Sequence, residues 1–494
     1  MLEYTDFDLR LTAEEFSECF DALKNRLILL QQQARKMKIP VILLFEGWGA
    51  SGKGRVISDL MQSLDARGFS VHGENPGAEG EDRYPFLHQY WARLPRAGDM
   101  AIFDRSWYGA VSVLAVEDGC GEEEYERRFR EIINFERLLR NEGTVILRFF
   151  LHISEKEQKK RFERLEEDKA TRWRVTKRDW KRHKQYAEYY RAFDRMLEKS
   201  VEAGLPWTIV EAHDRRFAAA KVYRTVVDAL ERALREREEG AGRKLLPYEY
   251  GHIHLLPVPR LEEVDLGASI EKEEYREELD ALQHRLFDLQ NRLYRKKIPL
   301  VLAYEGWDAA GKGGNIRRIT KALDPRGYEV VPISAPTETE RAYPYLWRFW
   351  TRLPKTGHTA VFDRTWYGRV LVERIEGFCG EEEWKRAYRE INLFEESLTD
   401  FGTILLKFWL HIDREEQLRR FKERQNTPEK QWKITEEDWR NREKWECYEQ
   451  AVNEMLERTS TEHAPWIVVE SNDKKYARIK TLRMLVTAIE KRLS

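Results

Sequence analysis

Short runs of apolar residues recur along the chain, and longer stretches with a helical spacing of apolar and polar positions separate them. In the second half the runs occupy residues 298–304, 328–334, 359–364, 403–412 and 464–471. Continuous apolar runs joined by helical segments predict a parallel sheet with helices on both faces. A long amphipathic helix is expected before each series, at about 15–38 and 270–296. The pattern therefore predicts the α/β class.

The same pattern occurs twice at a fixed offset. Gly47 and Gly306 are 259 residues apart (306 − 47), and this offset aligns prolines, tryptophans and charged pairs without a gap. A period this long indicates duplicated domains, since solenoid repeats span about 20 to 50 residues. We predict a first domain at 1–238, a linker containing glycines and prolines at 239–262, and a second domain at 263–494.

Composition narrows the class of protein. The 494 residues are 41% hydrophobic and 35% charged, with 86 basic against 87 acidic residues. No apolar run approaches the roughly 20 residues that span a bilayer, and the N-terminus lacks the apolar segment of a secretory signal. These features predict a cytoplasmic globular protein with no membrane partner. Because the formal charge is only -1, affinity for a polyanion must come from local clusters.

A candidate phosphate loop follows the first strand of the second half. Residues 306–313 read GWDAAGKG and fit the pattern GxxxxGK. In such a loop, backbone N–H groups at a helix N-terminus surround a phosphate and the lysine reaches the transferred group. We predict phosphate binding by Gly306, Gly311, Lys312 and Gly313. The pattern alone also fits an ordinary glycine-rich turn.

Two carboxylates accompany this loop. Asp363 ends an apolar run 57 residues after Gly306 (363 − 306), where phosphate-loop enzymes hold a metal-positioning carboxylate. Gly313 replaces the hydroxyl residue that usually binds Mg²⁺, so the metal needs another ligand. Asp308 lies in the loop itself. With Asp363 it is predicted to supply two oxygen ligands to Mg²⁺.

Asp363 opens the segment DRTWYGRVLVER, in which charged residues are closely spaced. We predict that Arg364 and Arg369 hold phosphate oxygens in the bidentate manner of arginine. Glu373 is predicted to orient an arginine or a metal-bound water. In a helix Arg369 and Glu373 are i, i+4 neighbours, so an ordinary solvated ion pair is the alternative.

A basic stretch at 414–433 is predicted to form a lid, because basic helices late in a phosphate-loop kinase close over phosphates. The predicted phosphate-binding residues are Arg419, Arg420, Lys422, Arg424 and Lys433. A solvated helix face is the alternative for each of them. Nucleic acid is not expected as a partner, because no RNA-binding signature is present.

The second half resembles the second polyphosphate kinase family in the motifs EGWDAAGKGG, APTETERAYPYLWRFWTRLP, FDRTWYGRVLVER, LLKFWLHIDREEQLRRFKER and APWIVVESNDKKYARI. The resemblance covers nearly all of 270–494 and, with losses, 15–235. The two-copy layout is similar to that of fused members described as polyphosphate:AMP phosphotransferases. The resemblance implies two tandem phosphate-loop kinase-like domains related to thymidylate kinase, with polyphosphate as donor, a nucleotide as acceptor and Mg²⁺. It also implies that the carboxylates, the lysine and the arginines above form the active site.

The first half has the same apolar runs but lacks some of the predicted active-site residues. At the positions of Asp308, Arg369 and Glu373 it has Gly49, Ala110 and Leu114. Lys53, Asp104, Arg105 and a basic lid remain. We predict that the first domain folds but is catalytically inactive, and that it either binds polyphosphate or braces the active copy.

The predicted reaction is in-line transfer of the terminal phosphoryl group of inorganic polyphosphate to AMP, giving ADP. Phosphoryl transfer needs alignment and charge neutralisation more than covalent chemistry, which matches the residues present. An ATP-dependent nucleoside monophosphate kinase and a polyphosphate-binding scaffold protein are the alternatives. The sequence leaves open the base specificity, the choice between AMP and ADP, and whether the chain forms a homo-oligomer.

Overall fold

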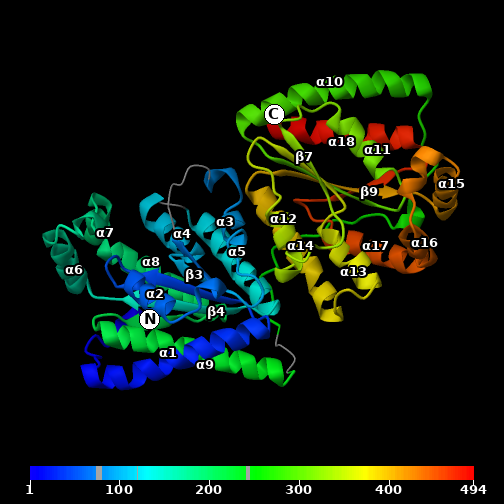
Figure 1. Ribbon diagram of the computed structural model, residues 1–494. Helices are drawn as coiled ribbons and strands as arrows, with labels where there is room; N and C mark the ends of the chain where they lie inside the picture. The colour runs from blue at the N-terminus through cyan, green and yellow to red at the C-terminus, as the bar shows by residue number, and fades with distance from the viewer. Residues whose placement is uncertain (74–80, 119–120, 241–244) are drawn as a thin grey trace. The chain divides into compact units, whose positions relative to one another are not determined.

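The computed structural model describes residues 1–73, 81–118, 121–240 and 245–494 (Figure 1). The chain forms two compact units, one built mainly from residues before 250 and the other mainly from residue 250 onward. Each unit contains one five-stranded sheet, as the repeated apolar pattern predicts. Within the described ranges, no helix has both the length and the apolar composition needed to cross a membrane.

The sheet of the first unit has the strand order β2-β3-β1-β4-β5, and its strands pair in parallel. Its strands are β1 Val41–Gly47, β2 Phe69–Gly73, β3 Met100–Asp104, β4 Val145–His152 and β5 Thr208–Glu211.

The second sheet has the order β10-β9-β6-β8-β7, which is the same topology read from the opposite edge. Its strands are β6 Leu300–Gly306, β7 Tyr328–Pro332, β8 Thr359–Asp363, β9 Ile404–His411 and β10 Trp466–Glu470. Four of the five fall within the predicted apolar runs, and β6 begins inside the run 298–304 and ends beyond it, at Gly306. The central strand β6 pairs with β8 on one side and β9 on the other. The loop after β6 therefore lies where the strand order reverses, which is where open α/β sheets bind ligands.

Helices surround each sheet (Figure 1). Those of the first copy are α1 Ala13–Lys36, α2 Lys53–Gln62, α3 His88–Trp91, α4 Trp107–Val113, α5 Glu122–Asn141, α6 Glu155–Glu167, α7 Lys177–Lys184, α8 Tyr186–Glu202 and α9 Arg215–Glu238. Those of the second copy are α10 Lys272–Lys296, α11 Lys312–Thr320, α12 Trp347–Trp350, α13 Val372–Ile375, α14 Glu381–Asp400, α15 Arg414–Gln425, α16 Glu436–Glu443, α17 Trp445–Thr459 and α18 Lys474–Leu493. The long helices predicted at about 15–38 and 270–296 are α1 and α10, which pack against α9 and α18.

Gly306 allows the chain to leave β6 and enter the loop. Its φ is 145°, and a Cβ atom there would lie 2.5 Å from the carbonyl oxygen of Leu410 on β9. Gly47 has the same role in the first copy, with φ of 125° and a Cβ position 2.3 Å from the oxygen of Leu151. Both distances are far inside van der Waals contact, so any side chain at either position would collide with the neighbouring strand.

The described part of the segment between the copies, residues 245–262, is hydrogen-bonded to one unit or the other. On its early side, the N–H of Glu249 donates to Oδ1 of Asn134 on α5 at 2.7 Å. On its late side, Leu256 donates to the carbonyl of Ser460 at 2.6 Å, and buried Leu261 donates to Oδ1 of Asn453 at 2.9 Å. Much of the glycine- and proline-containing stretch predicted as a linker thus packs as part of one unit or the other.

Candidate active site

The loop of the second copy places Lys312 at the start of α11. Gly311 precedes the helix in a left-handed conformation, and no side chain caps it. Backbone N–H groups at such a terminus need external acceptors, and phosphate oxygens are suitable ones. Nζ of Lys312 donates to the carbonyls of Gly306 and Trp307, the latter at 3.3 Å. The lysine is therefore folded against its own loop, within reach of an anion seated there.

Asp308 is held by two donors from distant parts of the chain. One carboxylate oxygen accepts from Arg364 at 3.1 Å, and the other accepts from Nδ2 of Asn441 on α16 at 3.1 Å. The backbone oxygen of Asp308 also accepts from Gln417 on α15 at 3.1 Å. Asn441 and Gln417 are site residues that the sequence analysis missed, because an amide inside a charged stretch has no distinctive pattern.

Asp363 ends β8 beside the loop, and Arg364 follows it with φ of 63°. Burial lowers the pKa of Lys312, while Asp308, Asp363 and Glu305 act in the opposite direction. Both predicted metal carboxylates are therefore close enough to influence the same ammonium group. Their convergence on the loop is the arrangement that the sequence spacing predicts.

Glu305 is a further buried carboxylate that the sequence analysis did not single out. It accepts from the N–H and the hydroxyl of Thr365, both at 2.8 Å, and so joins the end of β6 to the turn after β8. Burial raises the pKa of Glu305, and Lys312 opposes that shift. The matching Glu46 accepts from Ser106 in the first copy, so this link belongs to the shared fold.

Arg369 and Glu373 form the expected ion pair, with 3.1 Å between nitrogen and oxygen. Their side chains are only 13% and 25% exposed, and the Arg369 guanidinium lies over the ring of Tyr345 at 4.4 Å. These contacts argue against a freely solvated pair. Beneath this segment, Trp366 and Tyr367 donate to Glu395, which also pairs with fully buried Lys407 at 2.7 Å.

The basic stretch divides into residues that line a cavity and residues that do not. A cavity of about 250 Å³ lies against loop residues Ala309, Ala310 and Gly311. Its basic lining residues are Arg420, Arg424, Lys430, Lys433, Lys474 and Arg478. Arg424 and Lys433 were predicted, whereas Lys430, Lys474 and Arg478 were not. Arg419 and Lys422 are exposed and do not line this cavity.

Arg420 was predicted to bind phosphate, and its contacts indicate a different task. It is 2% exposed and donates to the carbonyls of Ala309, Ala310, Ser471 and Asn472 at 2.6 to 3.0 Å. It also donates to a carboxylate oxygen of Glu416. Arg420 therefore joins the loop to the turn before α18 and fixes the cavity wall.

Another, smaller cavity of about 80 Å³ lies against the first residues of the loop, Gly306, Trp307 and Asp308. It is also lined by Arg364, Gly368, Asn441, Trp445 and Tyr448. Trp307 stacks on Trp445 with 3.8 Å between ring centroids. The end of the loop thus lines a strongly basic cavity, and its beginning lines an aromatic one in which Asp308 and Arg364 meet.

In the first copy Gly49 leaves no carboxylate at the position of Asp308. A Cβ atom there would lie 3.2 Å from the ring of Phe162, so even a small side chain would press on that ring. Arg182 replaces Asn441 and pairs with Glu117 at 2.7 Å. The two copies share their fold and differ where the loop meets the lid.

The sheet order, the loop after the central strand and the charged groups around Lys312 define a phosphate-loop kinase-like protein containing two copies of the fold. The chain belongs to the polyphosphate kinase 2 family, whose profile matches residues 10–238 and 269–494. This finding confirms the resemblance seen in the motifs.

Relatives match the full length of the chain. It is 44% identical over 474 residues to a polyphosphate:AMP phosphotransferase of Pseudomonas aeruginosa, covering 96% of this chain and 94% of that protein. It is 35% identical over 485 residues to a polyphosphate:AMP phosphotransferase of Acinetobacter johnsonii, covering 97% of each. A crystal structure described as a polyphosphate kinase 2 from Pseudomonas aeruginosa PA01 superposes with a TM-score of 0.88 at 40% identity, covering 100% of this chain and 99% of that one.

Proposed function

We propose that this chain is a polyphosphate:AMP phosphotransferase whose second copy transfers the terminal phosphoryl group of inorganic polyphosphate to AMP, giving ADP. Relatives with that name align over both copies. The observation that carries the assignment to the second copy is the meeting of Asp308, Arg364 and Asn441 beside Lys312. In the first copy the corresponding aspartate is absent.

The two cavities beside the loop suit two different substrates. The basic cavity, with Arg424, Lys430 and Lys433, offers point charges to a chain of phosphates and is proposed to bind the donor. The cavity with Trp445 and Tyr448 offers aromatic surface beside Arg364 and is proposed to bind the nucleotide. Donor and acceptor phosphates would then meet at the loop.

Lys312, Arg364 and Arg369 are proposed to neutralise charge on the phosphoryl group as it moves. The N–H groups at the start of α11 add fixed donors that need no rearrangement during the reaction. The AMP phosphate is already ionised, so no strong general base is required. Asp308 is therefore assigned to positioning charge rather than to accepting a proton.

Asp308 and Asp363 are proposed to hold Mg²⁺. Carboxylate oxygens are the ligands that this ion prefers. Asp308 lies in the loop, and Asp363 ends β8 next to Arg364, which donates to Asp308. When bound, Mg²⁺ would neutralise charge on the phosphate oxygens and help to align them. Asn441 and Arg364, which hold Asp308, would keep its carboxylate turned toward the loop.

The test is to mix the purified chain with AMP and Mg²⁺, add either polyphosphate or ATP, and measure ADP. Polyphosphate-dependent ADP without added ATP is the expected result. ADP formed only with ATP would indicate a nucleoside monophosphate kinase. Binding of polyphosphate with no ADP from either donor would indicate a scaffold protein.

A further inference from the structure

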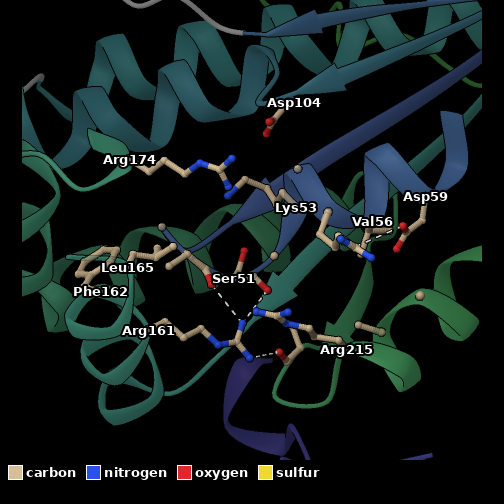
Figure 2. Close-up of a pocket in the computed structure, with 18 of the residues that line it drawn as sticks. Ser51, Lys53, Val56, Asp59, Asp104, Arg161, Phe162, Leu165, Arg174 and Arg215 are labelled. Carbon is tan, nitrogen blue, oxygen red and sulfur yellow. Dashed lines mark hydrogen bonds and ion pairs between the residues drawn. The ribbon is translucent and has the colours of Figure 1, made fainter. Parts of the chain in front are cut away.

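A basic cavity of about 750 Å³ lies at the loop of the first copy, and it is larger than the cavity of about 250 Å³ at the loop of the second copy. Lys53 and seven arginines line it against three aspartates, which leaves five more positive than negative charges. Arg174 comes from the 3-10 turn Arg172–Arg174 and Arg215 from the start of α9, and both approach the loop that carries Ser51 and Lys53 (Figure 2). A concave surface with this charge attracts a polyanion.

The loop itself retains features of an anion site. Ser51 is only 3% exposed and lines the cavity, and its hydroxyl has no hydrogen-bond partner among the described residues. Buried hydroxyls are normally bonded, so this one has capacity for a ligand oxygen. Gly52 precedes α2 in a left-handed conformation and the helix has no side-chain cap, which leaves helix N–H groups for the same ligand.

Charge around the loop lysine differs between the copies. In the second copy Asp308, Asp363 and Glu305 all favour the charged form of Lys312. In the first copy burial, Arg105 and Arg182 together lower the pKa of Lys53 to about 8, although Asp104 and Glu46 act in the opposite direction. One carboxylate has been lost and one guanidinium gained beside the loop. Arg364 in the second copy and Arg105 in the first act alike, so the added cation is Arg182, beside a loop that has one carboxylate fewer.

We propose that the first copy binds inorganic polyphosphate in this cavity without a metal ion and without transferring a phosphoryl group. The choice of polyphosphate rests on the proposed function of the chain. Arginines from four separate elements, which are α2, α6, the turn Arg172–Arg174 and α9, suit a ligand that presents phosphates in series. A nucleotide fits less well, because Arg182 and Tyr189, at the positions of Asn441 and Tyr448, both bind Glu117 at 2.7 and 2.8 Å.

The test measures fluorescence anisotropy of end-labelled polyphosphate mixed with the full chain in excess EDTA. Arg174→Gln combined with Arg215→Gln should weaken binding at least about tenfold. Both residues are exposed, so folding should survive their replacement. Arg172→Gln combined with Arg224→Gln is the matched control, because these exposed arginines belong to the same two elements and do not line the cavity. It should change binding less than about twofold.

The corresponding pair in the second copy is Lys433→Gln with Lys474→Gln, and it should affect metal-free binding less than the first-copy pair. Equal weakening by both pairs, equal weakening by the control, or no binding in EDTA would overturn the proposal. Displacement of the label by ATP as readily as by unlabelled polyphosphate would also overturn it, in favour of a nucleotide site. ADP formation is measured in parallel. Loss of the predicted binding by the first copy can then be told apart from loss of the reaction proposed for the second copy.

Discussion

At the scale of single residues, the copies differ most clearly at the fourth residue of the loop motif. Asp308 is fixed by Arg364 and Asn441, whereas Gly49 offers nothing to fix. Because two donors hold the Asp308 carboxylate in one orientation, it is suited to positioning a metal ion and the phosphate bound to that ion.

We expect Asp308→Asn and Asp363→Asn each to reduce ADP formation at least about 100-fold with folding intact, because each removes a charged ligand for Mg²⁺. Initial rates over a range of Mg²⁺ concentrations and circular dichroism spectra would measure both effects. The control is Asp288→Asn, the same chemical change on the exposed face of α10. Near wild-type turnover of either active-site variant at saturating Mg²⁺ would refute its assignment as a ligand.

The basic stretch gives a second prediction at this scale. Arg424→Gln with Lys433→Gln should raise the KM for polyphosphate about tenfold or more and reduce its dependence on salt, because these residues line the cavity. Arg419→Gln with Lys422→Gln removes the same charge outside the cavity and should change KM less than about twofold. If both double variants raised the KM equally, the basic stretch would attract polyphosphate only through its overall charge and not through contacts in the cavity.

At the scale of elements, β9 and the phosphate loop are joined through His411. Its Nδ1 accepts from Nε1 of Trp307 at 3.0 Å, so that nitrogen must be unprotonated. Burial lowers the pKa of His411 to about 4. The matching pair in the first copy is Trp48 and His152, at 2.8 Å.

This contact predicts how stability depends on pH. The folded pKa lies below the unfolded value of about 6.5, so neutral His411 contributes stability that is present above pH 6.5 and is lost as the pH falls toward 4. His411→Gln keeps an acceptor for Trp307 and removes the titration. The drop in melting temperature between pH 7 and pH 5 should therefore be smaller in His411→Gln than in the wild type. His284→Gln, an exposed change on α10, should keep the wild-type drop, and an unchanged drop in His411→Gln would contradict the argument.

Elements were the most predictable level of this structure. Central strands of a parallel sheet are buried on both faces and have continuous apolar sequences, so the apolar runs located β6, β8 and β9. The edge strand β7 is mostly exposed or half-buried, and its short apolar run still located it. The side-chain network was less predictable. Arg419 and Arg420 are adjacent and chemically identical, yet one is exposed and the other is buried against four carbonyls, because burial depends on which helix face meets the loop. Asn441 and Glu305 were missed because their hydrogen-bond partners, Asp308 and Thr365, lie 133 and 60 residues away in the sequence.

At the scale of the whole molecule, hydrogen bonds place the change from one unit to the other near residue 250. Leu256 and buried Leu261 both bond to α17 or its end, although they precede the predicted start of the second domain at 263. We expect a fragment of residues 250–494 to have a higher melting temperature than one of 263–494, because burying a leucine side chain contributes about 1.5 to 3 kcal/mol. Equal melting temperatures would show that these contacts add no stability.

The central claim is that phosphoryl transfer takes place only in the second copy. The most direct measurement is ADP formation from AMP and polyphosphate by the full chain carrying Lys312→Met, with the first copy left unchanged. We predict a rate at least about 100-fold below that of the wild type, because the removed ammonium would otherwise stabilise charge on the transferred group. A rate within about threefold of the wild type, with polyphosphate as the only donor, would show that the first copy or another site performs the reaction.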